Sequence, residues 1–230
     1  MNALYACPSC GGTFQESEGI IQSPGWPRRL SNTDGEQSCT WRISVTPGEL
    51  IQLRFNSLHM FGNNGHCWYD FVEIRDGHYG GSKLIGRYCN NDEQLPTTVT
   101  STASRLWIHF RYTSSVPNTG FELQYMAICG GNLSNNGRLQ SPNYPDEYTS
   151  RKDCVWVLDV PEGKRVALSF DSFDIERDDS CAYDYLEVRD GADVNSDLIG
   201  RYCGLDAPED ILSKGNKLYS AFKSNVIFFY

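Results

Sequence analysis

The chain has 230 residues, of which 40% are hydrophobic and 13% aromatic, and its formal net charge is −9 at pH 7. This length allows two domains of ordinary size, and the hydrophobic content argues against disorder. The negative charge argues against nucleic acid and anionic membrane surfaces as partners, because both would be repelled. It is compatible with binding cations or basic protein surfaces. No stretch approaches the roughly 20 apolar residues of a membrane span.

The cysteines repeat. The chain has nine cysteines, and the eight other than Cys7 form two sets of four with similar spacing, which indicates a disulfide framework and an oxidising, extracellular compartment. Spacing alone leaves the connectivity open, and pairing consecutive cysteines is the simplest hypothesis: Cys10–Cys39, Cys67–Cys89, Cys129–Cys154 and Cys181–Cys203. The N-terminus lacks the basic and apolar regions of a signal peptide, so we expect a fragment of a longer secreted or membrane-anchored protein.

Cys7-Pro8-Ser9-Cys10 has the C-x-x-C spacing of a zinc or redox motif. The rest of the chain has no second C-x-x-C, and its four histidines make no ligand pair at helical spacing. A structural role is therefore favoured for this motif. Cys7 is interpreted as the odd thiol, either free or paired outside this segment.

The expected elements are short strands, and they recur in two copies. In chain order, alternating or strand-like patterns cover residues 41–45, 53–55, 105–112, 120–125, 156–160, 167–170 and 184–189. The segments 67–89 and 181–203 align without a gap, and 14 of their 23 positions are identical. No amphipathic helix longer than two turns is evident. The pattern predicts an all-β protein of two β-sandwich domains, 7–127 and 128–230.

The second copy ends differently from the first. Phe222-Lys223-Ser224-Asn225 aligns with residues 110–113, but only residues 226–230 follow it, whereas the first copy continues through the strand-like segment 120–125. We therefore expect the second domain to lack its last strand, which would leave an edge or gap in its sandwich.

The motifs of both copies resemble the CUB domain family along nearly the whole chain. Both carry Cys-Gly-Gly, Ser-Pro-x-x-Pro, Cys-x-Trp, Cys-x-Tyr-Asp, Arg-Asp-Gly and Gly-x-Tyr-Cys. The resemblance implies two jelly-roll β-sandwiches with disulfides between consecutive cysteines. Closely joined domains look most like a cubilin-type endocytic receptor. CUB pairs also occur in tolloid-type and complement proteases and in collagen-processing enhancers, so the family does not settle the function.

An acidic segment, residues 170–184, distinguishes the second copy. Loop carboxylates without a thiol or imidazole suit a hard cation such as Ca²⁺. Many CUB domains bind one Ca²⁺, and the resemblance implies Glu176 and Asp184 as ligands with Tyr148 in support. Asn225 stands where the family has a further Asp; its oxygen can coordinate, but one negative charge is lost. The remaining acidic side chains are interpreted as solvated loop charges: Asp174, Asp178 and Asp179.

The first copy does not repeat this pattern. Leu30 stands where Tyr148 does, the Glu position falls at Phe61 or Gly62, and of the ligand set only Asp70 remains. A lone carboxylate cannot hold Ca²⁺ well. We therefore expect one Ca²⁺ in the second domain and none in the first.

Together, these expectations describe an extracellular binding module. We expect it to be non-catalytic, because no motif pairs a nucleophile with a base. Its ligands would be proteins presenting Lys or Arg to the calcium site. The leading hypothesis is a cubilin-like endocytic receptor. The alternatives are the non-catalytic part of a secreted tolloid-type metalloprotease or an enhancer, and a structural matrix module. Asn132-Leu133-Ser134 is the one glycosylation sequon, and an unmodified, exposed Asn132 is an equal alternative.

Overall fold

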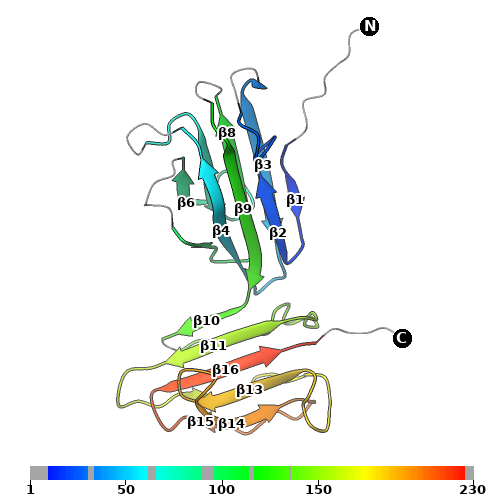
Figure 1. Ribbon diagram of the computed structural model, residues 1–230. Coiled ribbons are helices and arrows are strands. Elements are labelled where there is room, and N and C mark those ends of the chain that lie inside the picture. The colour runs from blue at the N-terminus through cyan, green and yellow to red at the C-terminus, as the bar shows by residue number, and fades with distance from the viewer. Residues whose placement is uncertain are drawn as a thin grey trace, which may run out of the picture. The chain divides into compact units, whose positions relative to one another are not determined.

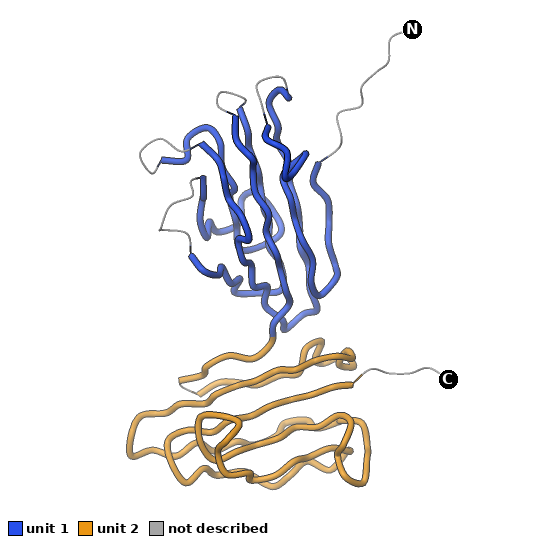
Figure 2. Tube along the Cα trace, in the orientation of Figure 1, with its two compact units in different colours: residues 1–128 blue, residues 129–230 orange. Residues whose placement is uncertain are grey.

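The computed structural model describes residues 10–30, 34–61, 66–89, 96–113, 117–134 and 136–225. Cys7, Gly62 and residues 226–230, which carried expectations above, lie outside this set. The chain divides into two compact units, residues 1–128 and residues 129–230 (Figure 2). All elements of the described residues are strands, which confirms the all-β prediction.

Unit 1 is a sandwich of two sheets (Figure 1). One sheet has five strands in the order β1-β3-β8-β5-β6, and the other has four in the order β2-β9-β4-β7. In chain order the strands are β1 Gly12–Phe14, β2 Glu18–Gln22, β3 Gln37–Ser44, β4 Leu50–His59, β5 Phe71–Asp76, β6 Lys83–Tyr88, β7 Val99–Thr100, β8 Arg105–Tyr112 and β9 Gly120–Ile128.

The core of unit 1 lies between these sheets because their strands alternate. In β8 every second residue is buried: Leu106, Ile108, Phe110 and Tyr112. β9 contributes the facing side chains Phe121, Leu123 and Tyr125, which are also buried. The Phe121 ring contacts the rings of Trp41 on β3 and Phe110 on β8, with centroids 5.6 and 5.4 Å apart. β9 therefore joins the two layers of the core.

Unit 2 repeats the five-stranded sheet, in the order β10-β11-β16-β13-β14, but its second sheet has only two described strands, β12 and β15. Its strands are β10 Gly130–Leu133, β11 Asp153–Asp159, β12 Ala167–Leu168, β13 Tyr185–Asp190, β14 Asp197–Tyr202, β15 Ile211–Leu212 and β16 Lys217–Lys223. The pairings β10·β11, β11·β16, β13·β16 and β13·β14 match β1·β3, β3·β8, β5·β8 and β5·β6. Internal duplication is thus present in the fold as well as in the sequence.

Within residues 129–225, unit 2 has no counterpart of β9. β16 corresponds to β8 and is the last strand among the described residues, which end at residue 225. The expected strand 167–170 is shortened to Ala167–Leu168, since β4, its counterpart, pairs with β9 along nearly its whole length. Trp156 is only partly buried, whereas the matching Trp41 is 4% exposed. The core of unit 2 is therefore smaller and more open.

Four disulfides join consecutive cysteines: Cys10–Cys39, Cys67–Cys89, Cys129–Cys154 and Cys181–Cys203. The parallel pairing of β10 with β11 explains the first glycine of the Cys-Gly-Gly motif. Gly130 has φ +105°, and a side chain there would collide with the backbone carbonyl of Val155. Only glycine permits this approach.

Candidate functional site

Asp184 directly precedes β13 and is 3% exposed. Both of its carboxylate oxygens accept hydrogen bonds from segments that are distant in the sequence. The phenol of Tyr148 donates to Oδ2 at 2.8 Å, and the backbone N–H of Asn225 donates to Oδ1 at 2.7 Å. A buried carboxylate needs such partners, because an isolated ionised one would carry a large desolvation cost. Asp184 therefore ties together the segments around residues 148 and 225.

Tyr148 connects Asp184 with Glu176. Its hydroxyl donates to Asp184 and accepts a hydrogen bond from the backbone N–H of Glu176 at 3.0 Å. Its ring packs against Phe222 of β16, with centroids 5.1 Å apart. Burial raises the pKa of Tyr148 to about 12; the bond from Glu176 lowers it and the Asp184 carboxylate raises it. The phenol is therefore a protonated donor at physiological pH.

Glu176 is held through its neighbour in the chain. The backbone N–H and carbonyl of Ile175 pair with those of Gly204, at 3.0 and 2.9 Å. The Glu176 side chain is exposed, and within the described residues its carboxylate makes no ion pair. The predicted residues Tyr148, Glu176, Asp184 and Asn225 thus belong to one hydrogen-bonded group, although they come from four separate segments.

The chemistry of this group suits a hard cation, since it offers two carboxylates and one carboxamide oxygen and no sulfur or imidazole. It is sparse: the described residues contain no group of three or more His, Cys, Asp or Glu side chains placed to hold a metal. Carbonyl oxygens and water would have to complete a shell of six to eight oxygens. In kind and charge the residues are compatible with Ca²⁺, and Asp184 and Glu176 are the carboxylates that could serve as its anionic ligands.

The equivalent position in unit 1 is closed by protein groups. Asp70 is fully buried, and its Oδ1 accepts from the backbone N–H and the hydroxyl of Thr113, at 2.8 and 2.7 Å. Asn118 Nδ2 donates to Oδ2 at 3.3 Å, and the Asn118 backbone pairs with that of Leu30, which is also buried. Phe61 is 38% exposed. Asp70 thus has its charge satisfied by hydrogen-bond donors of the chain itself.

Asp178 has a role that the sequence analysis missed. Its Oδ2 accepts hydrogen bonds from the backbone N–H groups of Ser180 and Ala182 and from the Ser180 hydroxyl, at 3.0, 2.9 and 2.7 Å. These bonds, that of Ala182 foremost, lower the pKa of Asp178. Asp178 therefore organises the loop before Cys181 rather than standing as a solvated charge. An Asp two residues before a Ser is a signal for such a turn.

An ion cluster around a buried glutamate was also missed, although its Glu and two Arg residues are identical in the two copies. Glu187 accepts hydrogen bonds from Arg189 and Arg201, and the Arg201 guanidinium stacks 4.0 Å from the Tyr185 ring centroid. Glu73 has the same arrangement with Arg75 and Arg87. Because the cluster occurs in both units, it belongs to the scaffold and not to the site that distinguishes unit 2.

Asn132 lies on β10 and is exposed, so the sequon is accessible in the structure. No helix in the described part of the chain has the length and apolar character needed to cross a membrane.

Comparison with known proteins finds relatives that match nearly the whole chain. Human Tolloid-like protein 1 is 51% identical over 96% of this chain and 21% of that protein. The Bone morphogenetic protein 1 homolog of Strongylocentrotus purpuratus is 50% identical over 97% of this chain and 34% of that protein. Procollagen C-endopeptidase enhancer 2 of Mus musculus is 33% identical over 95% of this chain and 54% of that protein. The chain thus spans no more than about half the length of these relatives. Residues 10–125 and 129–227 match the CUB domain family, and the chain therefore belongs to that family, with two CUB domains in tandem.

Proposed function

We propose that the chain is an extracellular, non-catalytic protein-binding module of a tolloid-type protease. About 50% identity over nearly the whole chain to Tolloid-like protein 1 and to a Bone morphogenetic protein 1 homolog carries this proposal. The expectation of a cubilin-type endocytic receptor is not supported, since these relatives are tolloid-type. Four disulfides support an extracellular location, because such bonds persist in oxidising compartments.

In this proposal unit 2 holds one Ca²⁺ through Glu176, Asp184 and the side-chain oxygen of Asn225. The ion would supply positive charge that draws the loops bearing these residues together. Asp184 is buried and anchors two segments, so it acts as the internal ligand. Glu176 is exposed and leaves lone pairs accessible to a partner. A Lys or Arg of a protein ligand would make a charge-assisted hydrogen bond to it. Unit 1 provides scaffold, because Leu30 stands where unit 2 has Tyr148 and no carboxylate matches Glu176, which leaves Asp70 alone.

Calorimetric titration of the whole chain with Ca²⁺ tests the metal site. We expect one saturable event at or below about 1 mM, the weak end of extracellular calcium modules. Glu176→Gln and Asp184→Asn should each abolish it or weaken it about tenfold, because each removes one of two anionic ligands. Asp179→Asn is the matched control, an exposed carboxylate in the same loop that should leave binding unchanged. Absence of saturable heat, or equal loss in all three variants, would refute the site.

The tolloid assignment has an independent test in the full-length coding sequence. A zinc-protease domain with a His-Glu-x-x-His motif in the same polypeptide is the expected finding. A polypeptide made of further CUB domains without a protease would instead favour a receptor or an enhancer.

A further inference from the structure

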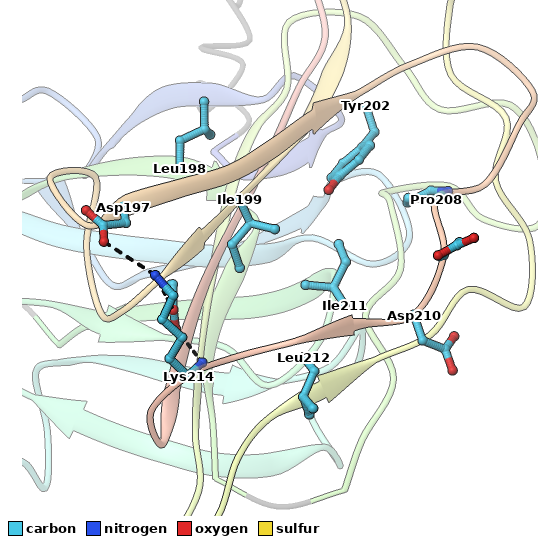
Figure 3. A pocket seen from close by; sticks show the side chains of 11 residues that line it. Asp197, Leu198, Ile199, Tyr202, Pro208, Asp210, Ile211, Leu212 and Lys214 are labelled. Atoms are coloured by element: carbon cyan, nitrogen blue, oxygen red, sulfur yellow. Dashed lines mark hydrogen bonds and ion pairs between the residues drawn. The ribbon is translucent and has the colours of Figure 1, made fainter.

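Unit 2 has a second surface feature, a groove of about 630 Å³ between β14 and β15. Figure 3 shows Ile199 and Ile211 pointing toward one another across it, with Tyr202 and Pro208 toward one end and Lys214 beside Asp197. β14 and β15 are the edge strands of the two sheets, so the groove follows the open side of the sandwich. Its size falls within the range of ligand-binding clefts, about 300–1,000 Å³.

The floor of the groove is apolar and exposed. Ile199 is the extra residue at a β-bulge, since Val188 pairs with Gly200 and Arg189 pairs with Leu198. Ile199 is 38% exposed and Leu212 is 51% exposed. In unit 1 the corresponding bulge residue, Ile85, packs against the core. Exposed apolar surface bordered by polar groups is typical of a protein-binding site.

The rim is acidic. Asp190, Asp197, Glu209 and Asp210 line the groove together with a single cation, Lys214. The Lys214 ammonium lies 3.8 Å from the carboxylates of both Asp190 and Asp197. Glu209 and Asp210 are exposed and form no ion pair within the described residues. The groove therefore has uncompensated negative charge beside its apolar floor.

Unit 1 shows that the fold does not require these residues. The strand pairings and the matching hydrogen bonds of Ser101 and Ser213 align the two copies at this place. Lys83 then corresponds to Asp197, while Thr97, Thr98 and Thr100 correspond to Glu209, Asp210 and Leu212. Asp190 is shared with unit 1, where Asp76 matches it, but Asp197, Glu209, Asp210 and the apolar Leu212 are particular to unit 2.

We propose that this groove binds an extended segment of a protein partner that carries an apolar side chain flanked by Lys or Arg. The apolar side chain would lie over Ile199 and Ile211, and the flanking cations would pair with Asp197 on one rim and with Glu209 and Asp210 on the other. The free edge of β14 offers backbone groups to an extended chain, which is the usual mode of β-augmentation.

The groove is separate from the calcium site. Asp184 precedes β13 and Asp190 ends it, so six extended residues, about 20 Å, separate the two carboxylates. Groove binding is thus expected to persist in a chelator, whereas contacts through Glu176 are expected to need calcium.

Fluorescence anisotropy with the whole chain tests the groove. The probe is a labelled peptide Lys-Arg-Leu-Val-Lys-Arg, and the matched peptide Lys-Arg-Ser-Ser-Lys-Arg has the same charge without the apolar anchor. In EDTA we expect saturable binding of the first and at least about tenfold weaker binding of the second, as expected when two apolar side chains are not buried. Equal affinity for both peptides would overturn the proposal, since it would show charge attraction alone.

Variants locate the binding. Replacing the groove residues by those of unit 1, with Asp197→Lys, Glu209→Thr, Asp210→Thr and Leu212→Thr, should weaken binding about tenfold or more. Every replaced side chain is exposed, so the fold should persist, which circular dichroism verifies. The charge-matched control is Asp146→Lys, Glu147→Thr and Asp179→Thr, exposed positions in the loops beside Tyr148 and Cys181. The control variant should bind the peptide as the wild type does. Equal loss of binding in both variants would overturn the proposal, and so would a wild-type chain that binds the peptide with Ca²⁺ but not in EDTA.

Discussion

Glu187 illustrates how one buried carboxylate depends on its neighbours. Burial raises its pKa, but the hydrogen bonds from Arg201 and Arg189 outweigh this and hold the pKa below the usual value of 4.5. A depressed pKa means that the folded state is stabilised above the unfolded pKa and loses this stabilisation as the pH falls through the folded one. Despite burial, the pKa of Glu73 in unit 1 is also lowered, by hydrogen bonds from Arg87 and Arg75.

We predict that Glu187→Gln lowers the free energy of unfolding of unit 2 by about 2 kcal/mol at pH 7, since it removes charge-assisted bonds. The deficit should shrink as the pH falls below 4.5, where the carboxylate of the unfolded wild type gains its proton, and should vanish once the folded state is protonated as well. Chemical denaturation at pH 7 and pH 3 measures this loss in the free energy of unfolding. The matching variant Glu73→Gln should lower the free energy of unfolding of unit 1 alone. A deficit that did not depend on pH would contradict the role of the charge.

Tyr148 supports the proposed calcium site without being a ligand, because its hydroxyl joins Asp184 to the backbone of Glu176. We predict that Tyr148→Phe weakens Ca²⁺ binding about tenfold and costs about 1 kcal/mol of stability, by leaving two polar groups without this partner. Calorimetry measures the first effect and thermal unfolding the second. Tyr183→Phe is the control, a 57% exposed ring two residues from Cys181. Equal effects in both variants would exclude a specific role for Tyr148.

At the scale of elements, unit 2 lacks counterparts of both β2 and β9 within residues 129–225, and β9 is the longer of these two strands. In unit 1 it buries Phe121, Leu123 and Tyr125 between the sheets, and such side chains each contribute about 1.5–3 kcal/mol when fully buried. Residues 129–225 contain no equivalent strand, and Trp156, Leu158 and Phe170 remain partly exposed.

This asymmetry predicts that unit 2 opens before unit 1. Amide hydrogen exchange should show higher protection in β3 and β8 than in the matching β11 and β16. Mass spectrometry of peptic fragments separates the four strands, and the matched pairs control for position in the sheet. Protection of equal size in both units would mean that the smaller core of unit 2 is compensated elsewhere.

At the scale of the whole molecule, each unit has two disulfides closing loops of similar length, 29 and 22 residues in unit 1 and 25 and 22 in unit 2. Loops of this size contribute about 3 kcal/mol each. The same number of disulfides should contribute a larger share of the stability in the unit with the smaller core. Unit 2, with less apolar surface buried, should rely on its bonds more.

We predict that complete reduction at 25 °C unfolds unit 2 while unit 1 keeps its fold. Limited proteolysis of the reduced chain should cleave within residues 129–225 and leave a fragment of unit 1 intact. The oxidised chain under the same protease is the control. Cleavage at equal rates in both units would show that the core of unit 1 also depends on its disulfides.

Much of the fold could be predicted because its signals are local or repeated. Alternation predicted strands at 41–45 and 105–112, which the structure has as β3 and β8. The expected strand 167–170 was too long, because its length was read from local alternation alone, without the effect of the missing partner strand. The family motif predicted that Tyr148, Glu176, Asp184 and Asn225 belong to one site, but it did not predict the hydrogen bonds that link them.

The sequence by itself determined the class of the protein: an all-β, disulfide-linked tandem of CUB domains, since cysteine spacing and side-chain alternation are properties of neighbours along the chain. Only the tertiary structure decided which polar groups meet. Asp184 finds Tyr148 at a separation of 36 residues and Asn225 at 41, and Asp70 is satisfied by Thr113, 43 residues away. The groove likewise joins β14 with the residues before and within β15. Such contacts depend on strand order and register, which bring distant residues together and which no local pattern encodes.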